Sequence, residues 1–448
     1  MATADPKTTG GFVFDEHPLR QAILEEVHAR PFPLLTAPMR AVHLAFMHGG
    51  ADAEGEFTAV CALFRAHGAK PPAAGARYHR SKIDLGVLRW ERHAEFTTYT
   101  WESLPGDDPI DEVVPRGPFG EHFVQPGPLL SAMRLVYLPD PGEAELDDWL
   151  LRFDQASLSV SDVARGLGIV ATDLKQDAQG YVRYLVVDRG MTWNRAGSIV
   201  LRLHEIETYR TLALLGLPEA QAVSPRVRAM ETELSAITAA VRDANDLAAN
   251  RELLARLSAL AGRLEADVAR ISYRMSATRA YDEILQARIE ALHEVARPGY
   301  GTLARFLARR HRPAIRTCNS VQKRQEALSV KIARAIDLLR ARVEIALQQQ
   351  NADLLHSMNS RAQLQLRLQQ TVEGLSIGAV SYYLIGIIGY AAKGLKTAGY
   401  LPVKQEIVTG VAVPFVVAFV WWTVRRIRRS HGEPHGAAPH EAAEKQPD

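Results

Sequence analysis

The 448-residue sequence predicts an α+β protein with a mixed α/β domain at its N-terminal end, long coiled-coil-like helices and two apolar C-terminal helices. Three observations predict this class. Short runs rich in β-branched and aromatic residues alternate with helical patterns in the first half of the chain. Beyond residue 226, apolar residues recur at steps of three and four. Near the C-terminal end, two long apolar stretches contain no charge.

Residues 12–220 are predicted to form the mixed α/β domain. We expect helices at 18–29, 54–67, 144–153 and 194–215, and strands at 39–47, 85–90, 95–101, 133–138, 157–160, 168–172 and 181–187. The last helix is expected to end at Gly216 and Pro218. Because side chains alternate across a strand, the run at 95–101 has two faces. One face carries Phe96, Thr98 and Thr100, and the other carries Thr97, Tyr99 and Trp101.

Residues 226–297 are predicted to form a long helical segment with a coiled-coil-like apolar seam. Its first part carries Val227, Met230, Leu234, Ile237 and Val241 at helical spacing. The weakest stretch is 245–250, so a single long helix and a tight hairpin both remain open.

A stalk helix is predicted for residues 314–370, and it is expected to continue into the first apolar stretch. No proline lies between Pro313 and Pro402, and no glycine between Gly301 and Gly374. One helix of about 115 Å can therefore run over 315–392, at 1.5 Å per residue. The alternative is a helix broken near Asn351 or Asn359.

Two transmembrane helices are predicted at 371–392 and 407–424, because each apolar stretch approaches the roughly 20 residues that cross a bilayer. Residues 393–406 form the loop between them, and residues 430–448 are expected to be a disordered tail. The alternative is a pair of buried helices in a soluble protein. The lipid bilayer is thus an expected partner.

Basic residues predict the orientation of the two spans. Arg425, Arg426, Arg428 and Arg429 follow the second span, whereas the loop carries Lys393, Lys396 and Lys404. The positive-inside rule then puts both termini in the cytoplasm. The expected location is the bacterial inner membrane, with two passes.

Composition and motifs exclude several classes of function. The formal net charge is only +2, so no nucleic-acid partner is expected. Cys61 and Cys318 are the only cysteines, which cannot build a disulfide framework. The chain contains no GxGxxG, GxxxxGK[ST], GxSxG or HExxH motif, so no cofactor is expected and an enzyme is not favoured.

Metal binding is left undetermined by the sequence. The histidines of the first domain either form a metal or catalytic cluster or serve ordinary polar packing: His28, His43, His48 and His93. An acidic loop either holds a divalent cation or is simply solvated: Asp107, Asp108, Asp111 and Glu112. The basic stretch 305–316 is expected to be a solvated turn, with an anionic lipid or nucleic-acid contact as the alternative.

Three segments resemble the DUF3422 family, a group of uncharacterised bacterial membrane-anchored proteins. They are HPLRQAILEEVHARPF (17–32), RWERHAEFTTYTW (89–101) and LRLHEIETYRTLALLGLP (201–218). The resemblance covers nearly the whole chain and implies a membrane-anchored protein, but it implies no activity.

The layout also resembles the CorA-type magnesium transporters, which are pentamers whose first span ends in Gly-Met-Asn. Gly389, Tyr390 and Ala391 stand in that region here, and the outer loop is basic. The resemblance implies a homo-oligomer, with a pentamer as one alternative, and a CorA-like ion channel or transporter with an altered selectivity motif. The rival hypothesis is a membrane-tethered scaffold or regulatory protein whose cytoplasmic domain binds a partner.

Candidate site residues follow from these two hypotheses. A stripe of small residues on the first span either lines a pore or packs helices together: Gly374, Gly378, Ser381 and Gly389, with Tyr390 beside them. Lys393, Lys396 and Lys404 would stand at the outer mouth of a pore, or would anchor the helix ends.

Overall fold

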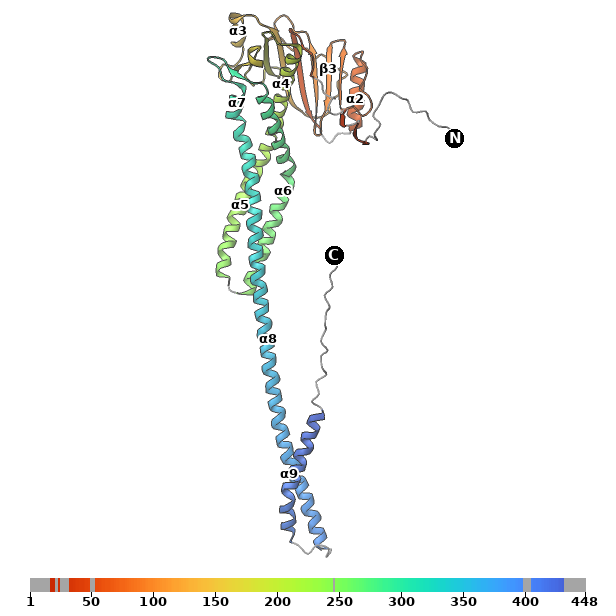
Figure 1. The fold of residues 1–448 in the computed structure, drawn as a ribbon, viewed down its shortest axis with the longest axis vertical. Helices are drawn as coiled ribbons and strands as arrows, with labels where there is room; N and C mark the ends of the chain where they lie inside the picture. Colours follow the sequence, from red (N-terminus) through yellow and green to blue (C-terminus); the bar gives the residue numbers. More distant parts are fainter. Residues whose placement is uncertain are drawn as a thin grey trace, which may run out of the picture. The chain divides into compact units, whose positions relative to one another are not determined.

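The computed structural model describes residues 17–20, 23–24, 32–48, 53–244, 246–397 and 404–430. These residues fall into two compact units, one holding nearly everything up to Leu339 and the other beginning at Arg340. The first unit contains a large β-sheet and a bundle of helices (Figure 1). The fold is therefore α+β with a mixed sheet and long helices, as the sequence predicts.

The described residues form a nine-stranded sheet with the order β2-β3-β4-β1-β5-β8-β7-β6-β9. Neighbouring strands run antiparallel, except that β5 and β8 are parallel. The strands are β1 (Met39–Met47), β2 (Tyr78–Ile83), β3 (Gly86–Arg92), β4 (Phe96–Ser103), β5 (Leu129–Pro139), β6 (Ser159–Val163), β7 (Gly168–Thr172), β8 (Val182–Asp188) and β9 (Val295–Ala296).

Helices cover both faces of this sheet because its central strands are apolar on both sides. On β5, Met133 and Leu135 belong to the cluster with helix α4 (Trp193–Leu214), whereas Val136 and Leu138 pack with α3 (Glu143–Leu150). Helix α2 (Ala53–Ala66) packs on the same side as α3, over β1, β3 and β4. The alternation of side chains along each strand thus separates two cores.

Three helices of the first unit form a bundle: α5 (Gly216–Asp243), α6 (Leu247–Glu290) and the first part of α8 (Arg312–Thr397). Their apolar seams meet in one buried cluster, which includes Val227, Leu257 and Leu328. Gly216 permits the close approach of α5 and α6, since a Cβ there would lie 2.3 Å from the Thr278 hydroxyl oxygen. The hairpin alternative for 226–297 is correct, with the break between Asp243 and Leu247.

Several sequence-based expectations need correction. Strands β2 and β9 and helix α7 (Leu303–Arg310) were not expected, and α6 ends at Glu290 rather than continuing to 297. Gly216 and Pro218 do not end the helical region, because α5 starts at Gly216. Proline is tolerated there in the first turn, where its missing N–H has no partner to lose. Most of the helix expected at 18–29 lies outside the described residues.

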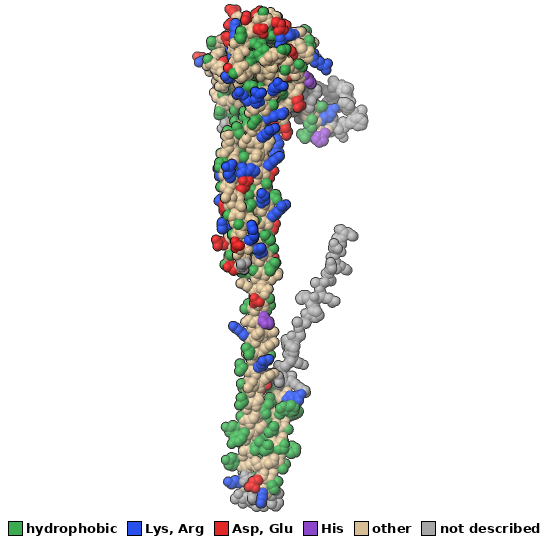
Figure 2. Space-filling view, turned by 90° about the vertical axis from the view of Figure 1, so that its left-hand side faces the viewer, with side chains coloured by type: hydrophobic (Ala, Val, Ile, Leu, Met, Phe, Trp, Pro, Cys, Tyr) green, Lys and Arg blue, Asp and Glu red, His purple; other side chains and the backbone are tan. Residues whose placement is uncertain are grey.

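Helix α8 is a single helix of 86 residues, so the alternative of a break near Asn351 or Asn359 is wrong. Helices α8 and α9 (Gln405–Ser430) each contain a stretch long and apolar enough to cross a membrane. Large apolar side chains cover their outer surfaces in Figure 2. Tyr382, Tyr383, Ile387, Phe415 and Phe419 are between 62% and 76% exposed. Such a surface fits contact with lipid better than contact with water.

Candidate functional site

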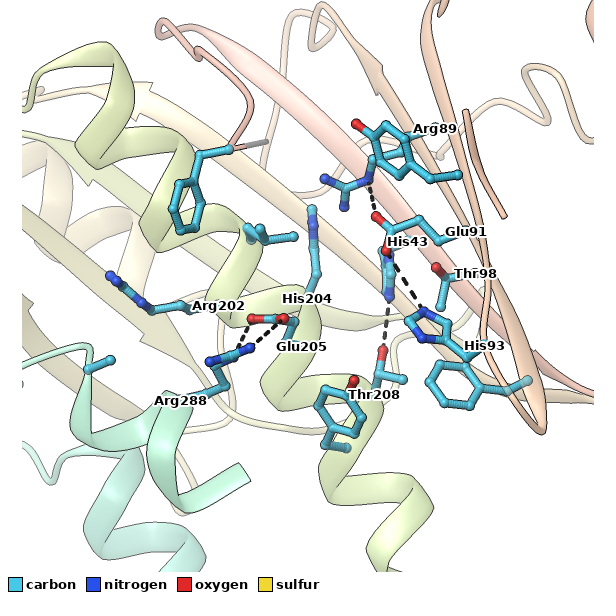
Figure 3. Close-up of a pocket in the computed structure, with 16 residues that line it drawn as sticks. His43, Arg89, Glu91, His93, Thr98, Arg202, His204, Glu205, Thr208 and Arg288 are labelled. Atoms are coloured by element: carbon cyan, nitrogen blue, oxygen red, sulfur yellow. Dashed lines mark hydrogen bonds and ion pairs between the residues drawn. The ribbon is translucent and has the colours of Figure 1, made fainter. Parts of the chain in front are cut away.

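A polar pocket of about 320 Å³ lies between the sheet and helix α4 (Figure 3). Its walls come from strands β1, β2, β3 and β4, from α4, from the end of α6 and from Phe32 ahead of β1. The volume falls at the lower end of the range for small-molecule sites, about 300–1,000 Å³. The charged and histidine residues of the wall are His43, Arg89, Glu91, His93, Arg202, His204, Glu205 and Arg288.

The sheet supplies its share of the pocket through strand alternation. Arg89 and Glu91 lie on the α4 side of β3, whereas Leu88 and Trp90 point into the opposite core. The register aligns Arg89 with Thr100 and Thr100 with His43, so these three residues form one row across β3, β4 and β1. Two hydrogen bonds at the Thr100 hydroxyl hold this row together. Arg89 donates one at 3.1 Å, and His43 Nδ1 shares the other at 2.8 Å.

Helix α4 supplies the opposite wall from one of its faces. Leu201, His204, Glu205 and Thr208 recur at the spacing that keeps residues on one side of a helix, and Arg202 lies at the edge of this face beside Glu205. Thr208 completes the contacts of His43, because its hydroxyl is hydrogen-bonded to the Nε2 atom at 2.9 Å. This contact joins residues that are 165 positions apart in the chain.

Two histidines form a buried, stacked pair at the centre of the site. The rings of His43 and His204 are 4.7 Å apart and 6° from parallel. Burial, with help from Arg89 and His93, lowers the pKa of His43 to about 3. Burial and then His43 and Arg89 also hold the pKa of His204 well below its usual value. Both rings are therefore neutral at physiological pH.

His204 differs from His43 because neither of its ring nitrogens has a hydrogen-bond partner among the described residues. Its side chain is only 2% exposed, so bulk water does not supply those partners. A neutral imidazole has one N–H donor and one acceptor nitrogen. Leaving such a buried group unpaired costs about 1–3 kcal/mol, so the arrangement is one that a bound group would stabilise.

The three arginines of the pocket also differ in their pairing. Arg89 lies 3.1 Å from Glu91, and Arg288 lies 2.6 Å from Glu205. Arg202, by contrast, makes no ion pair or hydrogen bond with any part of the chain that the structure describes. Desolvation and the neighbouring Arg288 guanidinium lower the pKa of Arg202, whereas Glu205 raises it. The lining of the pocket therefore includes one arginine without a carboxylate partner among the described residues.

The pocket does not have the composition of a metal site. Over the described ranges, no group of three His, Cys, Asp or Glu side chains is placed to hold a metal ion. Glu91 and Glu205 already face arginines. Hydrogen-bond donors and cationic groups predominate, which suits recognition of an anion.

The site residues expected on the first span lie in two different environments in the structure, some packed and some open. Ser381 is 4% exposed, and a Cβ on Gly389 would lie 3.6 Å from the Thr409 hydroxyl oxygen of α9. Gly374 and Gly378 instead face open space, and Tyr390 is 80% exposed. Lys393 and Lys404 are exposed, and the side chain of Lys396 lies outside the described residues.

The acidic loop is neutralised by arginines. Asp108 and Asp111 lie 2.6 and 3.4 Å from Arg152, and Glu112 is paired with Arg40. The solvated turn expected at 305–316 is wrong, because α7 and the start of α8 occupy this stretch.

Among the four histidines singled out in the sequence, His43 and His93 line the pocket. His48 instead contacts Thr97 and Glu56, and His28 lies outside the described residues. Sequence analysis missed Arg89, Glu91, Arg202, His204, Glu205 and Arg288 as site residues. A signal was present in the alternation of Arg89, Glu91 and His93, which puts three polar groups on one face of a strand that is apolar on the other.

The histidine pair predicts a loss of stability in acid. A folded-state pKa near 3 lies below the value of about 6.5 expected in the unfolded chain, so the unfolded state takes up the proton first. The contribution of His43 to the free energy of unfolding is fully present above about pH 6.5 and is lost as the pH falls toward 3. Between pH 7 and pH 5, the free energy of unfolding of the His43→Gln variant should therefore fall by about 2 kcal/mol less than that of the unmodified chain.

Denaturant unfolding at both pH values measures this difference. His122→Gln, at an exposed histidine, is the matched control and should follow the unmodified chain. Equal acid sensitivity of the His43→Gln variant and the unmodified chain would show that His43 is not buried and neutral.

Comparison with known proteins gives a family match and a weak structural likeness. No curated protein matches the sequence. A solved structure described as the full-length CmaX protein aligns with 12% identity over 73% of this chain and 94% of its own, at a TM-score of 0.14. That score is too low to carry an argument about fold or function. The profile of the family described as "Protein of unknown function (DUF3422)" matches residues 15–431. The chain therefore belongs to the DUF3422 family.

Proposed function

We propose that this protein is a membrane-tethered regulatory protein, whose N-terminal α+β domain recognises a small ligand in the pocket on the α4 side of the sheet. The observation that carries the proposal is a pocket lined by the buried His204, which has no hydrogen-bond partner among the described residues, and by Arg202, which has no carboxylate partner there. Structural polar groups inside a protein are normally paired, whereas groups kept for a ligand are free until it binds.

The apolar parts of α8 and α9 then act as the anchor, in the inner membrane of a bacterial cell. Ser381 and Gly389 turn toward the interior of the α8–α9 pair, which favours helix packing over a pore lining for these two residues. In this proposal both termini are cytoplasmic, and ligand occupancy regulates the binding of a partner.

A CorA-like ion channel or transporter is the second candidate. The observation that favours it is the unbroken α8, which runs from the α+β unit into the first apolar stretch. Gly374 and Gly378 also face open space and stay available for contact with an axial path or another copy. In this candidate, a homo-oligomer such as a pentamer surrounds the path.

Ion flux in proteoliposomes separates the two candidates. If the protein is a tether, ion flux should be no greater than in empty liposomes, whatever the oligomeric state of the protein. The channel predicts measurable flux that Gly378→Leu abolishes without dissociating the oligomer, because leucine at this open position would block an axial path. It also predicts that Lys393→Glu raises cation preference. Saturable flux in the unmodified protein would overturn the tether.

Topology provides a further prediction for both candidates. Reporter fusions at Met1 and after Arg429 should be cytoplasmic, because arginines at 425, 426, 428 and 429 follow the second span. A fusion between Lys393 and Lys404 should be external. Alkaline-phosphatase and fluorescent-protein fusions measure the two sides. An external C-terminus would mean that one of the two apolar helices does not cross the membrane.

A further inference from the structure

Part of helix α8 runs without a neighbour among the described residues. From Gln348 to Val372, every side chain is exposed. Figure 1 shows α8 as a lone helix ahead of the part that lies beside α9. Only three side chains of this stretch are charged: Asp353, Arg361 and Arg367. The stretch is thus a solitary helix with little charge to keep it in water.

A solitary helix of this composition lacks the interactions that stabilise a helix. Most helical stability in proteins comes from packing one apolar face against other elements. Within the described residues, the side chains of this stretch form no ion pair. Two amide–carboxylate hydrogen bonds join neighbouring turns, from Gln349 to Asp353 and from Gln369 to Glu373, and such pairs contribute little. The exposed apolar side chains therefore call for a covering partner.

Apolar side chains gather on one face of this helix, which we call the stalk face. Positions 351, 354, 358, 361, 365, 368, 372 and 375 alternate steps of three and four, which is the spacing of a coiled coil. Polar residues occupy positions 351, 361 and 365. The other five residues define the stalk face and are between 59% and 72% exposed: Leu354, Met358, Leu368, Val372 and Leu375.

Helix α9 leaves the stalk face uncovered. It packs on the side of α8 that carries Gly389, where a Cβ would lie 3.6 Å from the Thr409 hydroxyl oxygen. Ser381, which is 4% exposed, turns toward the same pair of helices. Ser381 follows Val372 by nine residues, and at about 100° per residue it lies on the opposite side of α8 from Val372. The described part of a single chain therefore does not cover the stalk face.

Lipid does not cover the whole stalk face either, if α8 is anchored as proposed. Leu354, Met358 and Leu368 precede the apolar stretch predicted to begin at residue 371. Arg367 and Glu373 stand at this boundary, and charged side chains are costly inside the hydrocarbon core. The three apolar side chains therefore lie on the water side of the boundary, where burial against another protein surface is favourable.

We propose that the stalk face is covered by the same face of further copies of this chain, in a parallel, in-register coiled coil. The proposal rests on the membrane anchor of the proposed function. Because the apolar stretch of α8 directly follows the stalk face, every anchored copy presents Leu354 at the same distance from the bilayer. Identical residues then meet in layers. Asn351 meets its counterpart in one layer, and a polar side chain at such a position fixes the register.

Disulfide cross-linking of the full-length chain in isolated membranes tests this contact. Leu354→Cys and Leu368→Cys place a thiol on the stalk face, and Gln363→Cys places one on the opposite side as the matched control. With copper–phenanthroline as the oxidant, the first two should form linked dimers at least about tenfold faster than the third, because a disulfide needs Cα atoms within about 7 Å. Cys61 and Cys318 are buried, so the unmodified chain gives the background.

A second measurement uses a substitution that should strengthen the contact. Arg361 occupies a coiled-coil position between Met358 and Leu368, where an in-register oligomer brings like charges together. Arg361→Leu should therefore lower the dissociation constant of the oligomer in detergent at least about tenfold, since it removes repulsion and buries an apolar side chain. Gln363→Leu adds the same side chain on the opposite side and should leave this constant unchanged. Analytical ultracentrifugation measures both variants, and the unmodified chain should have at least twice the mass of one 49.5 kDa chain.

Three results would overturn the stalk contact. The first is a monomeric chain without cross-links at 354 or 368. The second is equal cross-linking at 363, which indicates random collision. The third is a cross-linked product that contains a different protein in place of a second copy. These results leave the ligand pocket untouched, because it lies in the other unit and is judged by photolabelling. An external C-terminus in the reporter fusions would instead remove the anchor on which the register depends.

Discussion

Glu207→Ala is expected to lower the free energy of unfolding by about 3–5 kcal/mol, because it leaves an arginine without its buried counter-charge. Glu207 is 1% exposed and accepts hydrogen bonds from Arg210 at 2.7 Å and from the Tyr184 hydroxyl at 3.0 Å. Ser131 donates a further, longer bond. The carboxylate thus joins α4 to β5 and β8.

Denaturant unfolding of the full-length chain, followed by tryptophan fluorescence, measures this loss. Glu207→Gln keeps hydrogen-bonding capacity without the charge. Its free energy of unfolding should therefore lie between those of the unmodified chain and of Glu207→Ala. Glu219→Ala, at an exposed carboxylate of α5, is the control and should change stability by less than about 0.5 kcal/mol. A loss below 1 kcal/mol for Glu207→Ala would contradict the buried network.

Leu339→Pro is expected to be comparably severe, with a cost of about 3 kcal/mol or more from the backbone alone. Leu339 lies inside the unbroken α8, where proline removes a helix hydrogen bond and clashes with the preceding turn. The leucine side chain is also fully buried in the three-helix cluster. Far-UV circular dichroism during thermal unfolding should report a lower transition and a loss of helix.

Two further substitutions divide that effect into its causes. Leu339→Ala removes packing alone and should cost about 2–5 kcal/mol. Ala341→Pro carries the backbone penalty at an exposed position of the same helix. An unchanged transition for both proline variants would contradict a continuous helix in this region.

The sequence predicted the helical bundle well because one physical signal dominates there. Val227, Leu257 and Leu328 each belong to a series of apolar residues with the period of a helix, and a bundle buries one face of each helix. Strand β7 was predicted with its correct bounds, since all five of its residues are buried and flanked by breaks.

Other elements were missed because their local signals are weak. Strand β2 has the sequence YHRSKI and lies at the edge of the sheet, where only Ile83 is buried. An edge strand with one buried side chain shows no apolar alternation. The basic residues of α7 predict a turn, whereas the structure has a helix in which Leu303 and Leu307 are buried.

The pocket could not be assembled from the sequence because its parts are distant along the chain. His43 and Thr208 are 165 residues apart, and Arg288 comes from a third region. What the sequence did contain was the local pattern on each wall: the facing set of Phe96, Thr98 and Thr100, and the spacing of Arg202 and Glu205. Only the sheet order and the placement of α4 bring these walls together.

Photolabelling with 4-azidobenzoate most directly tests the claim that the pocket binds a small anionic ligand. The full-length chain would be irradiated with the probe in detergent, digested, and the adducts located by mass spectrometry. The account predicts adducts in β3–β4 (86–103) or α4 (193–214), suppressed by excess benzoate and by Arg202→Gln. The control Arg195→Gln, at an exposed arginine of α4 outside the pocket lining, should not suppress them. Labelling confined to α8 and α9, or labelling of the pocket that benzoate does not suppress, would contradict it.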